Sequence, residues 1–268
     1  VQPACAAGSG LAPAGAAVAP AGSGRGSLGV GATAVSILAW HEISDRPSPT
    51  AVPPRRFAAQ VDLLRDMGLA PVPLEEGASA GGRGVALTFD DGHLETYTRA
   101  YPILAGRGLT ATVYVATGFV STAGWFEPGG RPMTWAMVRE LHRSGWTIGS
   151  HTVRHGRLTG LDDAGLEREL TASRAALEDA LGSPCRHFCA PYGDMDDRVR
   201  QAALAAGYRT LALSVPVRHR LRETAGVLAR SGVYPGTSWW AFRVKARGWD
   251  ARIRGRALAS RGGAAGAD

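Results

Sequence analysis

A short apolar run at residues 85–89 ends directly on two adjacent aspartates, Asp90 and Asp91, and on Gly92. Because the run is brief, continuous and apolar except for one β-branched threonine, it predicts a buried strand, and the glycine predicts a turn. Adjacent carboxylates repel each other and gain nothing from burial alone. The pair therefore favours a cation partner at the strand end. The alternative is an Asx-type turn in which one aspartate caps the next helix.

Strand and helix patterns alternate along the middle of the chain. Strands are predicted at residues 35–40, 85–89, 110–116, 146–149, 185–190 and 209–213. Repeated β–α units with short connections imply a mainly parallel sheet, open or closed into a barrel. The predicted strands end at His41, at the aspartate pair, at His151 and at Pro191-Tyr192. In a parallel barrel these ends lie on one rim, where such folds keep their active sites.

Polar residues mark the starts of the predicted helices between these strands. Thr134, Asp162 or Asp163, and Asp194 are expected to cap three of them. Pro102 is expected to interrupt the helix that follows the aspartate pair, because proline lacks the N–H that a helix interior needs.

The two ends of the chain differ in composition from the middle. Residues 1–32 are almost entirely Ala, Gly, Pro and Ser, which predicts a flexible linker. Residues 33–242 suit a single α/β domain. Residues 243–268 predict a basic, disordered tail that could contact anionic envelope polymers. A linker of this kind often follows a signal peptide or lipid anchor, so we expect export to the outside of the cell or to its envelope.

The charge and the cysteines exclude two further readings. The formal net charge is +7, but Lys245 is the only lysine and the arginines do not alternate with aromatics, so no nucleic-acid partner is expected. Cys185 and Cys189 are four residues apart. On a strand they point the same way but lie too far apart to bridge, so we expect free thiols.

Two histidines, His151 and His155, follow a predicted strand and are four residues apart. If this segment is helical, both rings face the same direction, as two metal ligands from one segment must. Together with one aspartate they form a two-histidine, one-carboxylate set, which fits Zn²⁺ with positions open for water and substrate. The second aspartate then stays free to act as a general base.

Three segments together resemble a known family. Residues 88–92 (TFDDG), 151–155 (HTVRH) and 190–193 (APYG) are similar, in order and spacing, to motifs of polysaccharide deacetylases, the NodB-homology domain of carbohydrate esterase family 4. The resemblance covers roughly residues 34–242. It implies a distorted (β/α) barrel in a single domain and one divalent metal, usually Zn²⁺, with Co²⁺ or Ni²⁺ as alternatives. The implied metal ligands are Asp91, His151 and His155.

The same resemblance implies roles for three further residues. Asp90 is the expected base, and the backbone N–H of Tyr192 is expected to hold the oxyanion. Pro191 and Tyr192 are also expected to line the substrate site.

The chain departs from the family pattern at two places. Cys189 occupies the position where the third motif usually carries an arginine that orients the base, so Arg186 or Arg230 is expected to replace it. The late Leu-x-His motif that supplies the general acid is also absent, and His219 is the only later histidine. Residues 38–43 (LAWHEI) look like the opening of the poly-N-acetylglucosamine de-N-acetylase branch, in which the acid comes from the first strand. We therefore expect His41 to be the acid.

The remaining aromatics and histidines carry weaker expectations. Trp125 lies in a glycine-rich loop and is expected to stack on a sugar ring, the alternative being a loop anchor. Trp239 and Trp240 are expected in the core. His93, His142 and His187 are assigned to ordinary surface or helix positions.

These features predict a monomeric, metal-dependent hydrolase that removes N-acetyl groups from a polysaccharide or oligosaccharide containing N-acetylglucosamine. One alternative is a relative that acts on another substrate, such as peptidoglycan or acetylated xylan. The other is a carbohydrate-binding relative without turnover, because Cys189 and the missing late histidine leave two roles open.

Overall fold

The computed structural model describes residues 36–74, 84–125, 129–215 and 226–248 of the chain. The predicted linker at residues 1–32, His219 and residues 249–268 lie outside the described residues. None of the helices in these four ranges has the length and apolar character needed to cross a bilayer.

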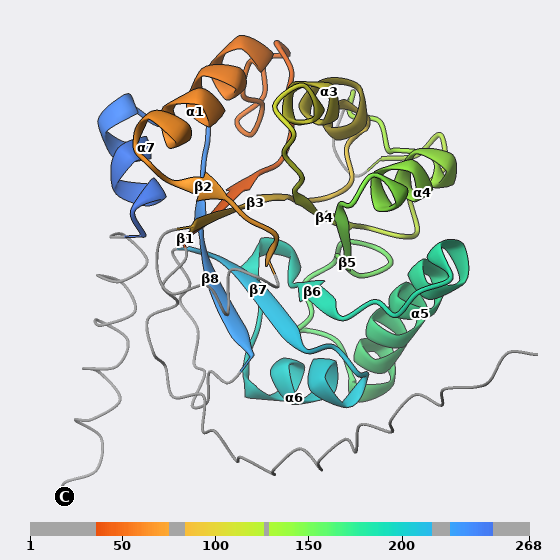
Figure 1. The fold of residues 1–268 in the computed structure, drawn as a ribbon. Helices are drawn as coiled ribbons and strands as arrows, with labels where there is room; N and C mark the ends of the chain where they lie inside the picture. The colour runs from red at the N-terminus through yellow and green to blue at the C-terminus, as the bar shows by residue number, and fades with distance from the viewer. Residues whose placement is uncertain (1–35, 75–83, 126–128, 216–225, 249–268) are drawn as a thin grey trace, which may run out of the picture.

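The strands form one sheet in which every neighbouring pair is parallel (Figure 1). They are β1 (Ser36–Trp40), β2 (Ala70–Pro71), β3 (Gly84–Phe89), β4 (Thr112–Val115), β5 (Thr147–Ser150), β6 (His187–Cys189), β7 (Thr210–Val215) and β8 (Val227–Gly232). The order is β1-β8-β7-β6-β5-β4-β3-β2, and an additional pairing of β1 with β3 closes a barrel of seven strands, with β2 outside it. The expected (β/α) barrel is confirmed.

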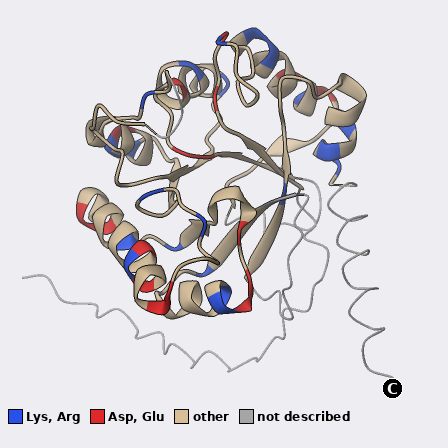
Figure 2. Cartoon of the chain, turned by 180° about the vertical axis from the view of Figure 1, so that it is seen from behind, with Lys and Arg blue, Asp and Glu red and all other residues tan. Residues whose placement is uncertain are grey.

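Helices surround the barrel (Figure 1). They are α1 (Pro54–Asp66), a π-helical turn η1 (Thr96–Ala100), α3 (Tyr101–Ala105), α4 (Trp135–Arg143), α5 (Asp163–Leu181), a 3₁₀ turn η2 (Pro191–Gly193), α6 (Asp197–Ala205) and α7 (Trp239–Ala246). Acidic and basic residues are mixed along these outer helices, as Figure 2 shows.

Most of the predicted helix starts agree with the structure, and one is wrong. The Thr134 side chain accepts a hydrogen bond from the N–H of Met137, and Asp162 caps α5 in the same way. The residue that caps α6 is Asp196 rather than Asp194. Asp194 instead accepts hydrogen bonds from the backbone N–H and hydroxyl of Thr159, which ties two loops together.

The helix after the aspartate pair is irregular rather than broken at Pro102. Pro102 lies in the first turn of α3, where a missing N–H costs nothing, and the π-helical turn η1 comes directly before it.

Helix α7 was not predicted from the sequence, and neither were the strands β2 and β8. The domain boundary expected at residue 242 falls inside it, so residues 243–246 are helical rather than part of a tail. Trp239 and Trp240 are 40% and 74% exposed, and the prediction that they belong to the core is wrong. The face that α7 buries carries Phe242 and Ala246 instead.

The core has two parts because successive strand residues point to opposite sides of the barrel wall. Leu38, Leu87 and Val113 belong to the larger cluster, between the strands and the helices. The residues next to them in sequence, Ile37, Ala86 and Tyr114, belong to a smaller cluster inside the barrel.

Candidate active site

Hydrogen bonds between neighbouring strand ends fix the backbone at Asp90 and Asp91. The N–H of Asp90 donates to the carbonyl of Trp40 at 2.9 Å, and the N–H of His151 donates to the carbonyl of Val115 at 2.9 Å. The carbonyl of Asp91 accepts from the N–H of Ala116 at 3.1 Å. The carboxyl ends of β1, β3, β4 and β5 are therefore held at one level, and the expected convergence of strand ends is present.

Asp91, His151 and His155 form a buried cluster suited to a metal ion. Oδ1 of Asp91 lies 3.2 Å from Nε2 of His151 and 3.1 Å from Nε2 of His155. Zinc bonds of about 2.0–2.1 Å at tetrahedral angles separate neighbouring ligand atoms by roughly 3.3 Å, close to this spacing. The same oxygen is buried and meets hydrogen-bond geometry with none of the described residues, as expected of an atom reserved for a cation. The three residues fit a divalent metal.

The two histidines converge through a loop and not through a helix. Residues 151–155 contain no helical turn, and Thr152 and His155 have left-handed φ values of 68° and 55°. The Thr152 hydroxyl accepts from the N–H of His155 at 3.0 Å. The condition of a helical segment is not met, and the rings meet without it, with centroids 4.9 Å apart.

A hydrogen bond sets which nitrogen of His151 faces the cluster. Nδ1 lies 2.7 Å from the carbonyl oxygen of Cys189, so it carries the proton and donates it. The Nε2 lone pair is then left for a metal, the usual arrangement of a ligating imidazole.

Asp90 is held by Arg230, which lies on β8. Nη1 donates to Oδ1 and Nη2 donates to Oδ2, each at 2.7 Å, and both side chains are almost fully buried. Nη1 also donates to the hydroxyl of Thr88, and the guanidinium lies over the ring of Tyr114, 5.1 Å from its centroid. Burial would raise the pKa of Asp90, but the Arg230 charge and hydrogen bonds outweigh it and hold that pKa below its usual value.

The structure thus decides between the two arginines that the sequence left open. Arg186 is exposed, whereas Arg230 is buried against Asp90. Cys189 lies beside it, with Sγ 2.9 Å from Nη2 of Arg230, so the thiol accepts from the guanidinium that replaces the motif's own arginine. Cys185 and Cys189 are both buried free thiols, as expected.

A second group, Asp90, His151 and Cys189, also has its ligand atoms within 4.8 Å of one another. Arg230 already contacts both the carboxylate and the thiol of that group. A positive charge in that place disfavours a cation, so the Asp91 cluster is the better metal site.

His41 lies beside Asp90. Its Nε2 is 3.8 Å from Oδ2 of Asp90, and its side chain is 19% exposed, so it is accessible from the rim. The ring stacks on Tyr234, with centroids 6.1 Å apart and planes at 26°. Tyr234 follows β8 and was not predicted from the sequence, because that strand was not recognised.

Tyr192 and Pro191 lie at the opposite side of the metal cluster, in the turn η2 after β6. Tyr192 has a φ of 59° and is 59% exposed, while Pro191 is buried. The Tyr192 ring lies 4.9 Å from that of His155, and Arg157 covers it at 4.8 Å. Trp125 is partly buried and lies edge-on to His93 at 4.9 Å, a contact that favours the loop-anchor alternative over sugar stacking.

His93 is the main site residue that the sequence analysis missed. It was assigned to an ordinary position, but it is fully buried and its Nε2 lies 3.4 Å from Oδ2 of Asp91. Its place directly after the Asp-Asp-Gly turn was the sequence feature that could have indicated its closeness to Asp91. Of the other histidines, His142 contacts Ser183 and His187 contacts Thr210, both away from the cluster.

Backbone strain is concentrated at this rim. Among the residues that the structure describes, the non-glycine positions with left-handed φ are Asp91, Ser121, Thr152, His155 and Tyr192. All but Ser121 belong to the site or adjoin its ligands. Strain of this kind persists where the surrounding structure over-determines a conformation, and it clusters at functional sites.

The pKa values of Asp91 and His155 suit metal ligands, whereas that of His151 is shifted the other way. Burial would lower the pKa of His151, but Cys189, Asp91 and Asp90 outweigh it and hold that pKa well above its usual value. Burial would raise the pKa of Asp91, but the three surrounding imidazoles hold it well below its usual value, so the carboxylate is ionised. Burial lowers the pKa of His155, which favours the neutral ring that a metal requires.

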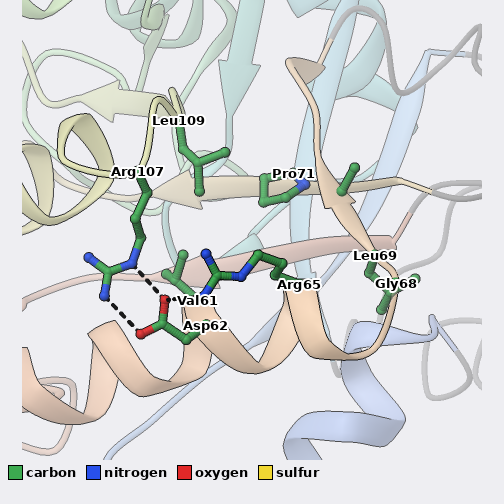
Figure 3. Close-up of a pocket in the computed structure, with 9 residues that line it drawn as sticks. Val61, Asp62, Arg65, Gly68, Leu69, Pro71, Arg107 and Leu109 are labelled. Carbon is green, nitrogen blue, oxygen red and sulfur yellow. Dashed lines mark hydrogen bonds and ion pairs between the residues drawn. The ribbon is translucent and has the colours of Figure 1, made fainter.

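A separate pocket lies at the other end of the barrel, by the amino ends of β2 and β3 (Figure 3). It is lined by α1 residues and by Arg107, which pairs with Asp62 through two hydrogen bonds of 2.8 and 2.9 Å. None of the predicted site residues lines it. The candidate site is therefore the rim at the carboxyl ends of the strands.

Comparison with known proteins agrees with this site. The model of the polysaccharide deacetylase family matches residues 77–211. A Bacillus subtilis (strain 168) protein named "Putative polysaccharide deacetylase YxkH" is 27% identical over 77% of this chain and 74% of its own length. A chitooligosaccharide deacetylase of Rhizobium leguminosarum bv. trifolii is 28% identical over 56% of this chain and 65% of its own. The solved structure of IcaB from Ammonifex degensii has a TM-score of 0.66 and 25% identity, and covers 80% of this chain and 97% of that one.

A parallel β/α barrel with an acidic and imidazole cluster at its carboxyl rim fits the class of barrel hydrolases. This chain belongs to the polysaccharide deacetylase family, whose members are hydrolases that act on amide bonds.

Proposed function

We propose that this protein is a metal-dependent hydrolase that removes N-acetyl groups from a polysaccharide containing N-acetylglucosamine. The observation that carries the proposal is the Asp91, His151 and His155 cluster beside a carboxylate, Asp90, that a buried arginine orients. We propose Zn²⁺ as the metal, with Co²⁺ and Ni²⁺ as alternatives, because this ligand set leaves positions open. Bound there, the metal would lower the pKa of a water molecule and polarise the acetyl carbonyl.

Asp90 acts as the general base in this proposal. It takes a proton from the attacking water while the oxygen of that water forms a bond to the carbonyl carbon of the acetyl group. Arg230 fixes both carboxylate oxygens, so Asp90 cannot rotate away from the water. Because the pKa of Asp90 is held low, the carboxylate is ionised and ready to accept at neutral pH.

His41 acts as the general acid. As the C–N bond breaks, the sugar nitrogen takes a proton from His41, and the products are acetate and a free amino sugar. The 3.8 Å separation between Nε2 of His41 and Oδ2 of Asp90 keeps acid and base within reach of one substrate amide. Stacking on Tyr234 holds the His41 ring in this position beside Asp90.

The Tyr192 N–H is proposed to stabilise the negative oxygen that forms at the carbonyl. Tyr192 is the second residue of the turn η2, and the first N–H groups of a helical turn have no acceptor within it. One such donor typically contributes about 2.7–4 kcal/mol to the transition state. The exposed ring of Tyr192 and the ring of Tyr234 leave aromatic surface on two sides of the site for a sugar.

The choice of substrate rests on the relatives. One of them is named a chitooligosaccharide deacetylase, and chitooligosaccharides are chains of N-acetylglucosamine. The alternative of a carbohydrate-binding protein without turnover was based on the missing arginine at Cys189 and the missing late histidine. The contacts of Arg230 and His41 with Asp90 support these two residues as their replacements. Peptidoglycan and acetylated xylan remain the alternative substrates to the proposed N-acetylglucosamine polymer.

Acetate release from N-acetylglucosamine oligomers by the zinc-loaded protein tests the proposal, with peptidoglycan and acetylated xylan as parallel substrates. We expect release from the oligomers, and its loss in His41→Ala. A zinc-bound protein that releases no acetate from any of the three would contradict the enzyme reading. Preferential release from xylan or peptidoglycan would contradict the substrate.

A further inference from the structure

His93 lies at the turn after β3, two residues beyond the proposed metal ligand Asp91. It is fully buried, although it belongs to neither of the candidate metal groups. Burying an imidazole or a carboxylate costs free energy unless a polar partner compensates for the lost water. The proximity of these two groups therefore points to an interaction between them.

The two oxygens of Asp91 have different neighbours. Oδ1 faces the Nε2 atoms of His151 and His155, at 3.2 and 3.1 Å. Oδ2 faces Nε2 of His93, at 3.4 Å. One oxygen is thereby directed at the proposed metal position, and the other is directed away from it toward His93.

Residues 119–125 and 129–133 fix the position of His93. His93 forms an isolated antiparallel bridge with Pro132, and the N–H of Leu94 donates to the carbonyl of Arg131 at 2.8 Å. The ring lies edge-on to Trp125, with centroids 4.9 Å apart and planes at 62°. Trp125 in turn packs against Phe119. Backbone and ring are both held, so His93 is a rigid partner for the carboxylate.

We propose that His93 is a positioning residue that donates its Nε2–H to Oδ2 of Asp91 and so keeps Oδ1 directed at the metal. This inference rests on the proposed function, because it assigns the metal to the Asp91 cluster. The terminal torsion of an aspartate is broad, so a carboxylate with one oxygen unrestrained samples several orientations. Partners that orient metal ligands in this way are typically worth about 10–100-fold in metal affinity.

Zinc affinity, measured by competition with a chromophoric chelator, tests this role without reference to turnover. In His93→Phe the ring and its packing on Trp125 are retained but the donor is lost, so we expect zinc to bind about 10–100-fold more weakly. In His93→Gln the side-chain amide reaches the place of Nε2, and we expect affinity near that of the wild type. His93→Asn, whose amide is too short to reach Oδ2, is expected to be weakened like His93→Phe.

His187→Phe is the matched control, since it replaces a buried, hydrogen-bonded histidine at the start of β6. We expect it to bind zinc like the wild type. The visible spectrum of the Co²⁺-loaded protein gives a second readout, because its bands follow the ligand geometry. We expect altered bands in His93→Phe and unchanged bands in His187→Phe.

Two results would overturn the proposal. Unchanged zinc affinity and Co²⁺ bands in both His93→Phe and His93→Asn would reduce His93 to a packing role. Equal loss of affinity in His93→Gln and His93→Phe would instead make the imidazole a direct ligand. Failure of the proposed function has a different signature, namely a wild-type protein that binds zinc and releases no acetate.

Discussion

Arg230 and Asp90 form a two-pronged ion pair inside the barrel, with Nη1–Oδ1 and Nη2–Oδ2 both at 2.7 Å. The two residues are 140 positions apart in the sequence. The orienting arginine therefore comes from β8, while the position that usually supplies it holds Cys189. The pair keeps a buried carboxylate ionised next to the candidate metal ligands.

Replacing Arg230 with Gln should impair the base. Burial then acts on the pKa of Asp90 without the opposing arginine, so that pKa rises and the carboxylate is protonated over more of the acidic range. We expect kcat to fall by about 10²-fold or more. The acid limb of the pH–kcat profile should move to higher pH, and steady-state acetate release across pH measures both.

Arg186→Gln is the matched control for that experiment, because Arg186 is an exposed arginine close to β6. It should leave both kcat and the acid limb unchanged. An Arg230→Gln enzyme with a wild-type pH profile would show that Asp90 is not the titrating base.

The same ion pair predicts how stability responds to acid. The folded-state pKa of Asp90 lies below its ordinary value of 3.8, so the pair stabilises the fold above that pH. The contribution is lost as the pH falls through the folded-state pKa. Urea midpoints of the metal-free protein should therefore decline as the pH falls below about 5, and more steeply than those of Asp90→Asn. Parallel declines would argue against this linkage.

Removing one partner of the buried pair should also destabilise the protein at neutral pH. Arg230→Met leaves the charge of Asp90 buried without compensation, which typically costs about 3–5 kcal/mol. Equilibrium urea unfolding measures the loss. The double variant Arg230→Met, Asp90→Leu should recover part of it, because no uncompensated charge remains; a double variant no more stable than the single one would count against this explanation.

His41→Gln should separate catalysis from metal binding. Loss of the general acid should lower kcat by about 10²–10⁴-fold. Zinc affinity should stay near the wild-type value, since the closest charged contact of His41 is with Asp90. His142→Gln, a change on the outer helix α4, should alter neither quantity. Weakened zinc binding in His41→Gln would instead make His41 a ligand.

Zinc should stabilise the folded protein. A ligand at 100 times its Kd adds about 2.7 kcal/mol to the free energy of unfolding, roughly 5–10 °C in Tm for a domain of this size. Asp91→Asn should abolish the increase, because a neutral amide replaces the anionic ligand. A chelator should stop acetate release, and added Zn²⁺ should restore it. A Tm that rises equally in Asp91→Asn would place the metal elsewhere.

The Asp62–Arg107 pair at the far pocket (Figure 3) should matter little to function. Its side chains are 40% and 27% exposed, so solvent screens the interaction and its contribution is at most about 1 kcal/mol. Arg107→Gln should leave kcat unchanged and lower stability by no more than that amount. A large loss of acetate release in this variant would connect the far pocket to the reaction.

Much of the fold was predictable because local patterns carry it. The apolar runs of β1, β3 and β4 and the caps Thr134 and Asp162 follow from periodicity and hydrogen-bonding chemistry within a few residues. The strand β8 was missed because its sequence, VLARSG, places an arginine where a buried strand is expected to be apolar. That arginine can be buried because its charge is paired with Asp90 inside the barrel. Export and the monomeric state stay predictions from the sequence.

The sequence by itself determined which side chains follow the strands, and hence Asp90, Asp91, His41, His151 and His155 as the candidate residues. A parallel barrel puts all carboxyl ends on one rim, so order along the chain was enough. The tertiary structure alone decided which partners these residues meet. Closure of β1 onto β3 and β8 brings Arg230 to Asp90, and the turn after β3 brings His93 to Asp91. Such contacts depend on strand pairing and loop packing across the barrel, which no local pattern encodes.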